Sequence, residues 1–282
     1  MTGTLYLCAT PIGNLKDMTE RVIETLQMAD LIAAEDTRNS IKLLNHFQIT
    51  TPMTSYHEYN KVEKAHSLIS KMKSGQNIAL ITDAGTPAIS DPGEVLVRLC
   101  QEEGVPVTSL PGPAALITAL TVSGLSTRRF CFEGFLPADK KERKLVLNDL
   151  VEESRTMIVY EAPHHLKSTL QELADTLGDR KMTICRELTK KFETIQPTSL
   201  TEAVACYQTQ EPRGEYVLVL EGKSFQQKIE EQQAVYQDMS IEAHMKKYEE
   251  NGMDTKEAMK MVAKDRGISK REVYQYLLNN TP

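Results

Sequence analysis

The sequence lacks the usual marks of a secreted, membrane-bound or metal-binding protein. Its five cysteines form no C-x-x-C pair, and most lie in apolar runs, which is typical of cysteines that serve as small buried hydrophobic side chains. No stretch approaches the roughly 18 apolar residues of a membrane helix. The first residues have neither a basic segment nor a long apolar run, so we expect no signal peptide. The sequence therefore predicts a protein of the reducing cytoplasm, with no membrane contact and no metal centre.

The chain also lacks an excess of basic residues. Thirty-three basic and thirty-nine acidic side chains give a formal net charge of −6. This balance excludes a protein that coats nucleic acid through bulk positive charge, although local basic patches are compatible with it. The 282 residues are 40% hydrophobic and 26% charged, which is ordinary for a soluble globular protein of about two domains.

The familiar catalytic signatures are missing as well. The loop after the first predicted strand reads ATPIGN and so has no G-x-G-x-x-G of a dinucleotide-binding fold. There is no H-E-x-x-H and no G-x-S-x-G, which are signatures of zinc proteases and of serine hydrolases. His164 and His165 are adjacent at a predicted helix start and would point in different directions, so they predict no shared metal site.

Short β-rich runs alternate with helical stretches through most of the chain, which predicts an α/β fold with mostly parallel sheets. The predicted strands span residues 5–9, 31–34, 77–82, 105–110, 130–135, 156–161, 181–187 and 215–220. The predicted helices span residues 19–28, 40–47, 93–103, 140–152 and 164–177. We place a boundary in the loop region 110–127, and predict an α/β domain over 1–115, a second α/β domain over 116–224 and a helical domain over 225–282.

The C-terminal part differs in charge from the rest, with ten basic and ten acidic side chains after residue 222. A predicted helix begins at Asp254 or Thr255 and ends at Gly267, and Ser269 with Glu272 forms a capping box for the next helix. Two helices joined by a glycine turn are typical of a helix-turn-helix unit. This pattern is equally compatible with two roles. One is a nucleic-acid contact through Lys264, Arg266, Lys270 and Arg271, and the other is plain dimerisation or packing.

Three loops rich in glycine and proline directly follow predicted strands. They span residues 9–14, 82–93 and 111–115. In an open α/β sheet, ligands bind outside the carboxyl ends of the strands, where these loops are expected. Gly85 would allow a ligand close to the backbone, and Asp83 would offer a carboxylate to a cationic or hydroxyl-bearing ligand. Together the loops predict a small-molecule pocket.

These loops belong to a longer series of segments between about residues 4 and 222. The series reads CATPIGNLKDMTERV, AEDTR, ITDAGTPAISDPG, LPGPAALITAL, FEGFLP, YEAPHH, CRELTKKFE and RGEYVLVLEG. It resembles the tetrapyrrole methylase superfamily of S-adenosylmethionine-dependent methyltransferases. AEDTR together with DAGTPAISDPG is similar to the branch called ribosomal RNA small subunit methyltransferase I. The resemblance implies two α/β domains with the cofactor in the cleft between them, a helical C-terminal domain and a homodimer.

The resemblance also implies a reaction. It is the transfer of a methyl group from S-adenosyl-L-methionine to the ribose 2′-oxygen of a cytidine in the decoding region of 16S rRNA, within the small ribosomal subunit. Two alternatives stay open. One is a methylase of the same fold that acts on a small molecule or a protein, and the other is a catalytically silent RNA-binding assembly factor.

Carried over residue by residue, the resemblance implies a set of contacts with the cofactor. They are Pro11, Asp83, Ala84, Gly85, Thr86, Ile89, Ala114, Ala115, Glu161, Ala162, Pro163, Leu188 and Gly214. Thr86 stands where the wider family often has an aspartate. This departure leaves open which residue would hold the amino-acid moiety of the cofactor.

A hydroxyl acceptor must lose its proton to a base or to water. Our candidates for the base are Asp36, His57 and Glu58, each of which also fits a helix cap or loop packing. Tyr56 or Tyr59 is expected to stack on an RNA base. The full set of residues predicted to contact RNA is Arg38, Tyr56, Lys190, Lys191, Lys270 and Arg271, and a solvated surface role fits the charged ones as well.

Overall fold

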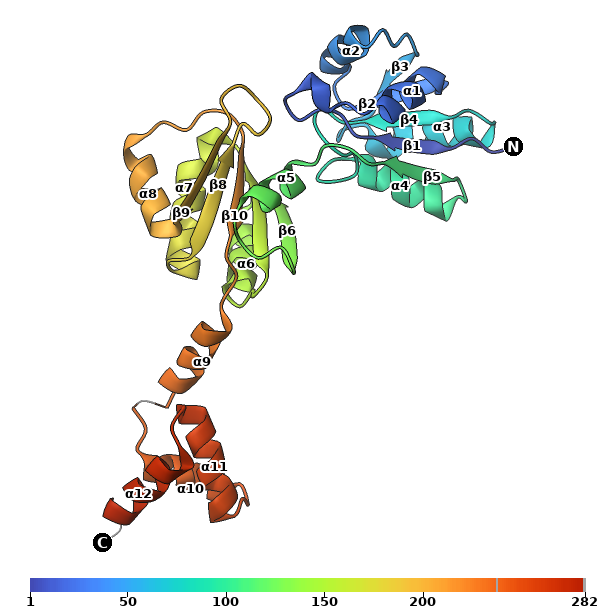
Figure 1. Cartoon of the computed structure of the whole chain (residues 1–282). Helices are drawn as coiled ribbons and strands as arrows, with labels where there is room; N and C mark the ends of the chain where they lie inside the picture. The colour runs from blue at the N-terminus through green and yellow to red at the C-terminus, as the bar shows by residue number, and fades with distance from the viewer. Residues whose placement is uncertain (237, 281–282) are drawn as a thin grey trace. The chain divides into compact units, whose positions relative to one another are not determined.

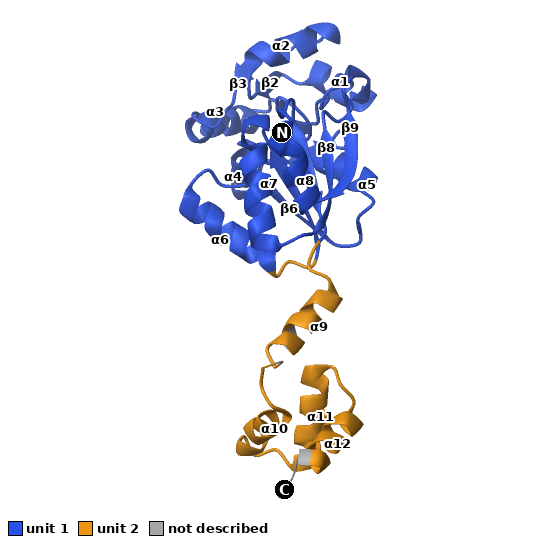
Figure 2. Ribbon diagram, turned by 90° about the vertical axis from the view of Figure 1, so that its left-hand side faces the viewer, with its two compact units in different colours: residues 1–151, 155–221 blue, residues 152–154, 222–282 orange. Residues whose placement is uncertain are grey.

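The chain folds into two compact units in the computed structural model, which describes residues 1–236 and 238–280. One unit comprises residues 1–151 and 155–221, and the other residues 152–154 and 222–282 (Figure 2). The larger unit contains two five-stranded sheets, whereas the smaller one is helical. An α/β fold with appended C-terminal helices is therefore confirmed, while the division into three domains stays a prediction.

The first sheet is entirely parallel, with strand order β3-β2-β4-β1-β5 (Figure 1). Its strands are β1 (Leu5–Cys8), β2 (Leu31–Ala34), β3 (Met53–Ser55), β4 (Ile78–Ile81) and β5 (Val107–Leu110). The 3₁₀ turn η1 (Leu15–Asp17) follows β1, and the helices are α1 (Glu20–Met28), α2 (Thr37–His46), α3 (Lys61–Lys73) and α4 (Gly93–Glu102). The strands read as continuous apolar runs because helices cover both faces. The α3 and α4 side chains form one core, and those of α1 and α2 form the other.

Parallel pairing fixes where a ligand site can form. The carboxyl ends of all five strands lie at one edge, so the loops that follow β1, β4 and β5 emerge there together. The prediction of a parallel sheet is confirmed for this half of the larger unit. The glycine- and proline-rich loops therefore share one edge, as expected for a binding site in an α/β sheet.

The second sheet, β6-β7-β10-β8-β9, is mostly antiparallel, and the prediction of mostly parallel pairing is wrong here. Only β6 and β7 pair in parallel. The strands are β6 (Phe130–Phe135), β7 (Thr156–Glu161), β8 (Lys181–Arg186), β9 (Thr194–Ser199) and β10 (Tyr216–Leu220). The loop between β8 and β9 is too short to hold a crossover helix, and an antiparallel hairpin is the only pairing it permits.

Helices cover the second sheet unequally. The three helices α6 (Lys140–Val151), α7 (Pro163–Leu177) and α8 (Leu200–Thr209) pack on one face. The short helix α5 (Ala115–Val122) packs on the other, with buried Leu116, Ala119 and Leu120. In the described ranges no helix has the length and apolar character needed to cross a bilayer.

The smaller unit contains α9 (Phe225–Ala234), α10 (Ile241–Glu250), α11 (Thr255–Arg266) and α12 (Lys270–Asn280). Its core comprises Ile241, Met245, Ala258, Val262, Ala263 and Val273. The predicted capping devices are confirmed. The Asp254 side chain accepts a hydrogen bond from the N–H of Glu257, and Gly267 ends α11 at φ +65°. Ser269 and Glu272 bond reciprocally, at 2.6 and 3.2 Å, as a capping box does.

Candidate functional site

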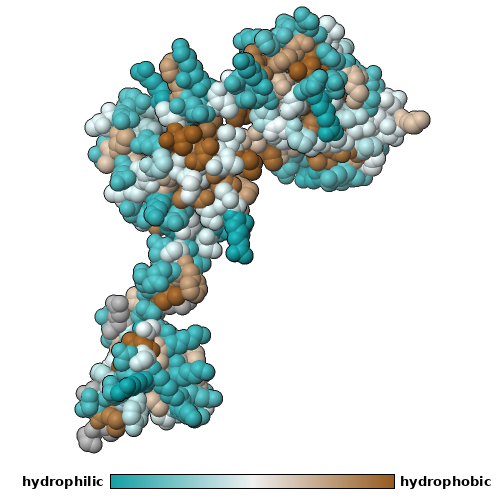
Figure 3. Space-filling view, viewed as in Figure 1, coloured by the Kyte–Doolittle hydropathy of each residue, from teal (hydrophilic) through white to brown (hydrophobic). Residues whose placement is uncertain are grey.

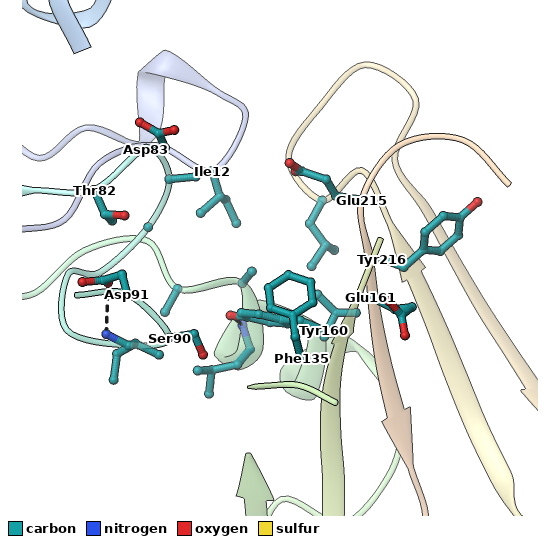
Figure 4. A pocket seen from close by; sticks show the side chains of 18 of the residues that line it. Ile12, Thr82, Asp83, Ser90, Asp91, Phe135, Tyr160, Glu161, Glu215 and Tyr216 are labelled. Carbon is teal, nitrogen blue, oxygen red and sulfur yellow. Dashed lines mark hydrogen bonds between the residues drawn. The ribbon is translucent and has the colours of Figure 1, made fainter. Parts of the chain in front are cut away.

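A cavity of about 460 Å³ lies in the larger unit, at the carboxyl edge of the first sheet. One wall comes from the segments that follow β1, β2 and β4 and from the start of α5, and the other from residues in or next to β6, β7, β8 and β10. Figure 4 shows Ile12, Phe135 and Tyr160 pointing toward the middle of the cavity from different segments. Segments far apart in the sequence therefore enclose one small-molecule-sized space.

Most of the residues predicted to bind the cofactor line this cavity. Eleven of the thirteen do so: Asp83, Ala84, Gly85, Thr86, Ile89, Ala114, Ala115, Glu161, Ala162, Pro163 and Leu188. Pro11 and Gly214 are not in the lining, although the next residues, Ile12 and Glu215, are. The structure thus brings the predicted set together, and the role of each as a cofactor ligand stays a prediction.

Hydrogen bonds join the three loops of the first wall. Thr10 and Gly85 exchange backbone bonds of 2.9 and 3.0 Å, and the hydroxyl of Thr86 donates to the carbonyl of Pro113 at 2.9 Å. Gly85 has φ +87°, which favours glycine, and a Cβ there would lie 3.3 Å from Cγ2 of Ile12. Backbone conformation therefore requires glycine here, in addition to the close ligand approach that the sequence predicts.

A carboxylate holds the second half of the loop between β4 and α4. Asp91 accepts hydrogen bonds from the N–H groups of Ala88 at 3.0 Å, Ile89 at 3.2 Å and Gly93 at 2.8 Å. Ala88 and Ser90 have φ values of +67° and +61°, a strained region for residues with a side chain. Burial raises the pKa of Asp91. The Asp91 side chain thus acts as a structural support of the loop.

The aromatic side chains of the second sheet form the opposite wall. The Tyr160 ring lies 4.8 Å from that of Phe132 and 5.6 Å from that of Phe135, both edge-on. Its hydroxyl oxygen accepts the N–H of Leu116 at 3.0 Å, and burial raises the pKa of this phenol. Tyr160 thereby fixes the first turn of α5, a helix end whose N–H groups otherwise lack partners.

Glu161 is a buried carboxylate, only 5% exposed, with a chain of polar partners. Its Oε1 accepts the N–H of Ala162 at 2.8 Å, and its Oε2 accepts the hydroxyl of Thr169. The Thr169 oxygen in turn accepts a bond of 2.7 Å from the Arg143 guanidinium. This chain of hydrogen bonds links a negative charge at the cavity wall to a positive charge behind it.

The charged side chains that line the cavity are all acidic, namely Glu35, Asp83, Asp91, Glu161 and Glu215. Glu215 pairs with Lys190 at 2.8 Å, and Asp91 and Glu161 have the partners described above. Glu35 accepts a hydrogen bond of 2.6 Å from the Thr82 hydroxyl. Burial raises the pKa of Asp83, and the nearby carboxylate of Glu35 raises this pKa further. The lining therefore favours a cationic ligand.

The three predicted base candidates do not line the cavity. Asp36 caps α2 by accepting the N–H of Arg38 at 2.8 Å, and hydrogen bonds from Arg38 hold the pKa of its carboxyl below the ordinary value. Glu58 forms an ion pair with Lys61. Nδ1 of His57 is buried and has no hydrogen-bond partner in the described chain. Asp36 and Glu58 are thus engaged by neighbouring groups, whereas one ring nitrogen of His57 has no partner in the described chain.

The sequence analysis did not select Glu35, which lines the cavity. Glu35 directly follows the last residue of β2, so it emerges at the carboxyl edge of a parallel strand. That position was a usable signal, because the same argument selected Asp83 after β4.

The structure corrects the expectation for Tyr56. This side chain is 1% exposed, and its hydroxyl donates to the carbonyl of Pro92 at 3.0 Å, so no ring face is left for an RNA base. Tyr59, the alternative in the same loop, is 97% exposed. Its ring centroid lies 6.1 Å from that of His57.

The other residues predicted to contact RNA differ in how exposed their side chains are and in whether they form ion pairs. Lys190 pairs with Glu187 at 2.9 Å and with Glu215, which indicates that it braces the loop after β8. Lys191 is exposed, with its ammonium 5.5 Å from the ring centroid of Phe192. The remaining members of the set, all exposed on their helices, are Arg38, Lys270 and Arg271.

A variant that removes the hydroxyl of Thr169 tests the chain behind the cavity wall. Thr169→Val should destabilise the chain by about 1–3 kcal/mol, because a buried carboxylate and a guanidinium each lose a partner. The control is Thr176→Val in the same helix, a half-buried residue. Urea unfolding followed by circular dichroism measures both variants. If both variants lost the same free energy of unfolding, this hydrogen-bond chain would have no special role in stability.

Curated proteins resemble this chain over nearly its whole length. Curated relatives named "Ribosomal RNA small subunit methyltransferase I" include that of Halalkalibacterium halodurans, 48% identical over 96% of this chain and 93% of that protein. Those of Bacillus subtilis and Escherichia coli O157:H7 are 46% and 43% identical, over 96% and 98% of this chain and 93% and 95% of the relatives.

Solved structures with lower identity support the fold alone. A uroporphyrin-III C-methyltransferase from Thermus thermophilus matches with a TM-score of 0.56 at 15% identity, over 78% of this chain and 94% of that chain. A diphthine synthase matches with a TM-score of 0.60 at 13% identity, over 79% and 91%. The family model described as "Tetrapyrrole (Corrin/Porphyrin) Methylases" matches residues 4–204. The chain therefore belongs to the tetrapyrrole (corrin/porphyrin) methylase family.

Proposed function

We propose that this chain is an S-adenosyl-L-methionine-dependent methyltransferase of 16S rRNA, acting on the ribose 2′-oxygen of a cytidine in the decoding region of the small ribosomal subunit. The observation that carries the proposal is the acidic cavity, enclosed by the family's loops in a methylase-family chain. The relatives that match over nearly their whole length are named for small-subunit rRNA methylation, which supports the substrate.

The residues of the cavity fit this cofactor. Its volume of about 460 Å³ lies in the range of roughly 300–1,000 Å³ for small-molecule sites. A sulfonium and an ammonium give the molecule two positive charges against one carboxylate, and the lining offers carboxylates without lysine or arginine. Ile12, Phe135 and Leu188 would flank the adenosine, and Glu35 and Asp83 would hold the ammonium group.

The protein's own contribution is positioning. When bound, S-adenosylmethionine supplies a methyl group already activated on a sulfonium centre. The loops that would hold it are cross-linked by the Thr10–Gly85 and Thr86–Pro113 hydrogen bonds, which limits their motion. Holding reacting groups about 3–3.5 Å apart in the right orientation contributes roughly 7–11 kcal/mol to lowering a barrier.

We propose that the RNA acceptor binds at the loop after β3. This strand ends at the same edge of the parallel sheet as the other four. His57 would accept the proton of the ribose hydroxyl, because its side chain is half-buried beside the exposed Tyr59, whereas Asp36 caps α2 and Glu58 pairs with Lys61. Tyr59, exposed and next to His57 in space, would stack on the base of the target nucleotide.

We further propose a cytoplasmic homodimer. The face of the second sheet that carries α5 is only partly covered, and exposed Ile117, Val122 and Ile195 lie on it. Ile195 pairs with Cys185, which packs in the α5 core, and side chains of paired residues point to the same face. Light scattering of the full chain would give twice the monomer mass, and a monomer would remove this part of the proposal.

The reaction itself is tested with labelled cofactor and three acceptors. Small ribosomal subunits without the modification should accept label, and digestion should release it as 2′-O-methylcytidine. Free 16S rRNA is a second acceptor, which separates RNA from the assembled subunit as substrate. A tetrapyrrole is the third, and label found only there would contradict the proposal.

The charge of Asp83 is tested by cofactor binding. Asp83→Asn should weaken S-adenosylmethionine about tenfold in calorimetry, because an ion pair at a half-closed site is lost. In the parent protein, affinity should fall as acidity protonates Asp83, and the fall should begin above the range of an ordinary aspartate, since the pKa of Asp83 is raised. The variant should lose that inflection. Asp149→Asn, an exposed site on α6, is the control, and equal affinities of the two variants would reject the assignment.

The base is tested by separating turnover from binding. His57→Asn should lower kcat on small subunits by about 10²-fold or more, the usual contribution of a general base, while the dissociation constant of the cofactor stays unchanged. His46→Asn on α2 is the matched control. An unchanged kcat for the His57 variant would show that water or another group accepts the proton.

A further inference from the structure

Helix α11 presents three lysines on one side. Lys256, Lys260 and Lys264 recur every four residues and are all exposed. At a rise of 1.5 Å per residue, successive lysines are about 6 Å apart along the axis. The opposite side of the helix carries Ala258 and Val262, which are buried in the core of the smaller unit. Packing of the helix therefore forces the three ammonium groups outward.

The acidic and basic residues at the end of α11 are directed inward instead. Asp265 bonds the hydroxyl of Tyr248 and lies 3.3 Å from Nε2 of the buried His244. Arg266 donates to Nδ1 of His244 at 3.2 Å and to the carbonyl of Ser240 at 3.0 Å. Asp265 thus does not neutralise the lysines. Arg266, a candidate nucleic-acid contact in the sequence analysis, instead stabilises the start of α10.

A fourth ammonium extends the lysine row at the start of α12. Nζ of Lys270 donates to the carbonyl of Lys256 at 3.2 Å, which places it at the first turn of α11. Tyr274, one turn further along α12, is 52% exposed. In the described part of α11 and α12 six basic side chains stand against three acidic ones. Figure 3 shows a predominantly hydrophilic surface where Figure 1 draws α11.

We propose that Lys256, Lys260, Lys264, Lys270 and Tyr274 form an RNA-binding surface, which we call the α11 basic surface. The lysines contact successive phosphates as point charges, without reading sequence, and Tyr274 stacks on an unpaired base. An acidic protein would also be attracted to the lysines. RNA is favoured because a straight row of cations beside an exposed aromatic ring matches a single strand, and in this respect the inference rests on the proposed function.

The inference is tested by matched triple variants of the full chain. One carries Lys256→Gln, Lys260→Gln and Lys264→Gln, and the control carries Lys140→Gln, Lys141→Gln and Lys144→Gln on α6, which are equally exposed helical lysines. Fluorescence anisotropy with a labelled 16S rRNA fragment gives affinity over a range of salt concentrations. The slope of log K against log salt should decrease by about 2–3 for the α11 variant, since each phosphate contact contributes roughly 0.7–0.9. The control should keep the parent slope.

Tyr274→Ala gives a second, independent readout. It should weaken RNA binding about tenfold while leaving the salt slope unchanged, because stacking releases no counterions. Cofactor affinity in calorimetry should be the same for all these variants, which shows that the larger unit is intact. Equal salt slopes for the two triple variants would overturn the α11 basic surface.

Two further outcomes separate this inference from the proposed function. If the α11 variant loses affinity for small subunits but binds the naked fragment like the control, the partner is a ribosomal protein and the RNA assignment is wrong. If the parent chain transfers no methyl group to unmodified subunits, the proposed function fails, and the RNA affinities still decide the surface by themselves.

Discussion

The cross-linking of three loops at one edge of a parallel sheet is the constraint on which the rest of the site depends. Thr10 and Gly85 bond through their backbones, and the Thr10 hydroxyl also donates to the carbonyl of Thr82 at 3.0 Å in the interior. Thr86 extends the connection to the loop after β5. Without these bonds, loops that follow three separate strands would have no fixed relative position. With them, the larger unit keeps one wall of a cavity in place before any ligand arrives, which reduces the ordering cost of binding.

The charges of the protein are separated by role. The cavity is lined by carboxylates that suit a cation, whereas exposed lysines gather on α11 in the smaller unit. An acidic cavity repels phosphate, and a basic helix repels a sulfonium. The near-neutral sum over the smaller unit and the net charge of −6 conceal this separation. Charge balance over the whole chain is consequently a poor guide to its partners, since the sign of each local surface matters more.

The sequence was sufficient for four of the five strands of the first sheet, all except β3, and for most of the cavity. Continuous apolar runs such as Ile78–Ile81 predict strands buried on both faces, and glycine-rich loops after them predict the ligand edge. Pairing in the second sheet depends on which strands meet, which local patterns do not encode. The strand β9 was missed because it contains Pro197, which is tolerated there since β9 is an edge strand. Helix α5 was missed because its sequence ALITALTV has no polar face from which to read a period.

The same limit applies to single side chains. Tyr56 and Tyr59 share one loop and one residue type, and only the fold decides that the first is buried against Pro92 and the second is exposed. Asp36 and Glu35 are adjacent, but Asp36 caps α2 whereas Glu35 lines the cavity. Sequence position predicted the region in each case, because loops after parallel strands share an edge. It could not predict which neighbour faces the ligand, since that depends on backbone direction over one or two residues.

The central claim is that the cross-linked loops and the start of α7 enclose S-adenosylmethionine. Hydrogen exchange of the full chain, measured by mass spectrometry with and without this molecule, tests the claim most directly. Exchange should become slower on binding in the peptides that cover residues 82–92, 111–116 and 160–164, which all contribute to the lining. Protection that leaves these peptides unchanged and falls elsewhere in the chain would contradict the account.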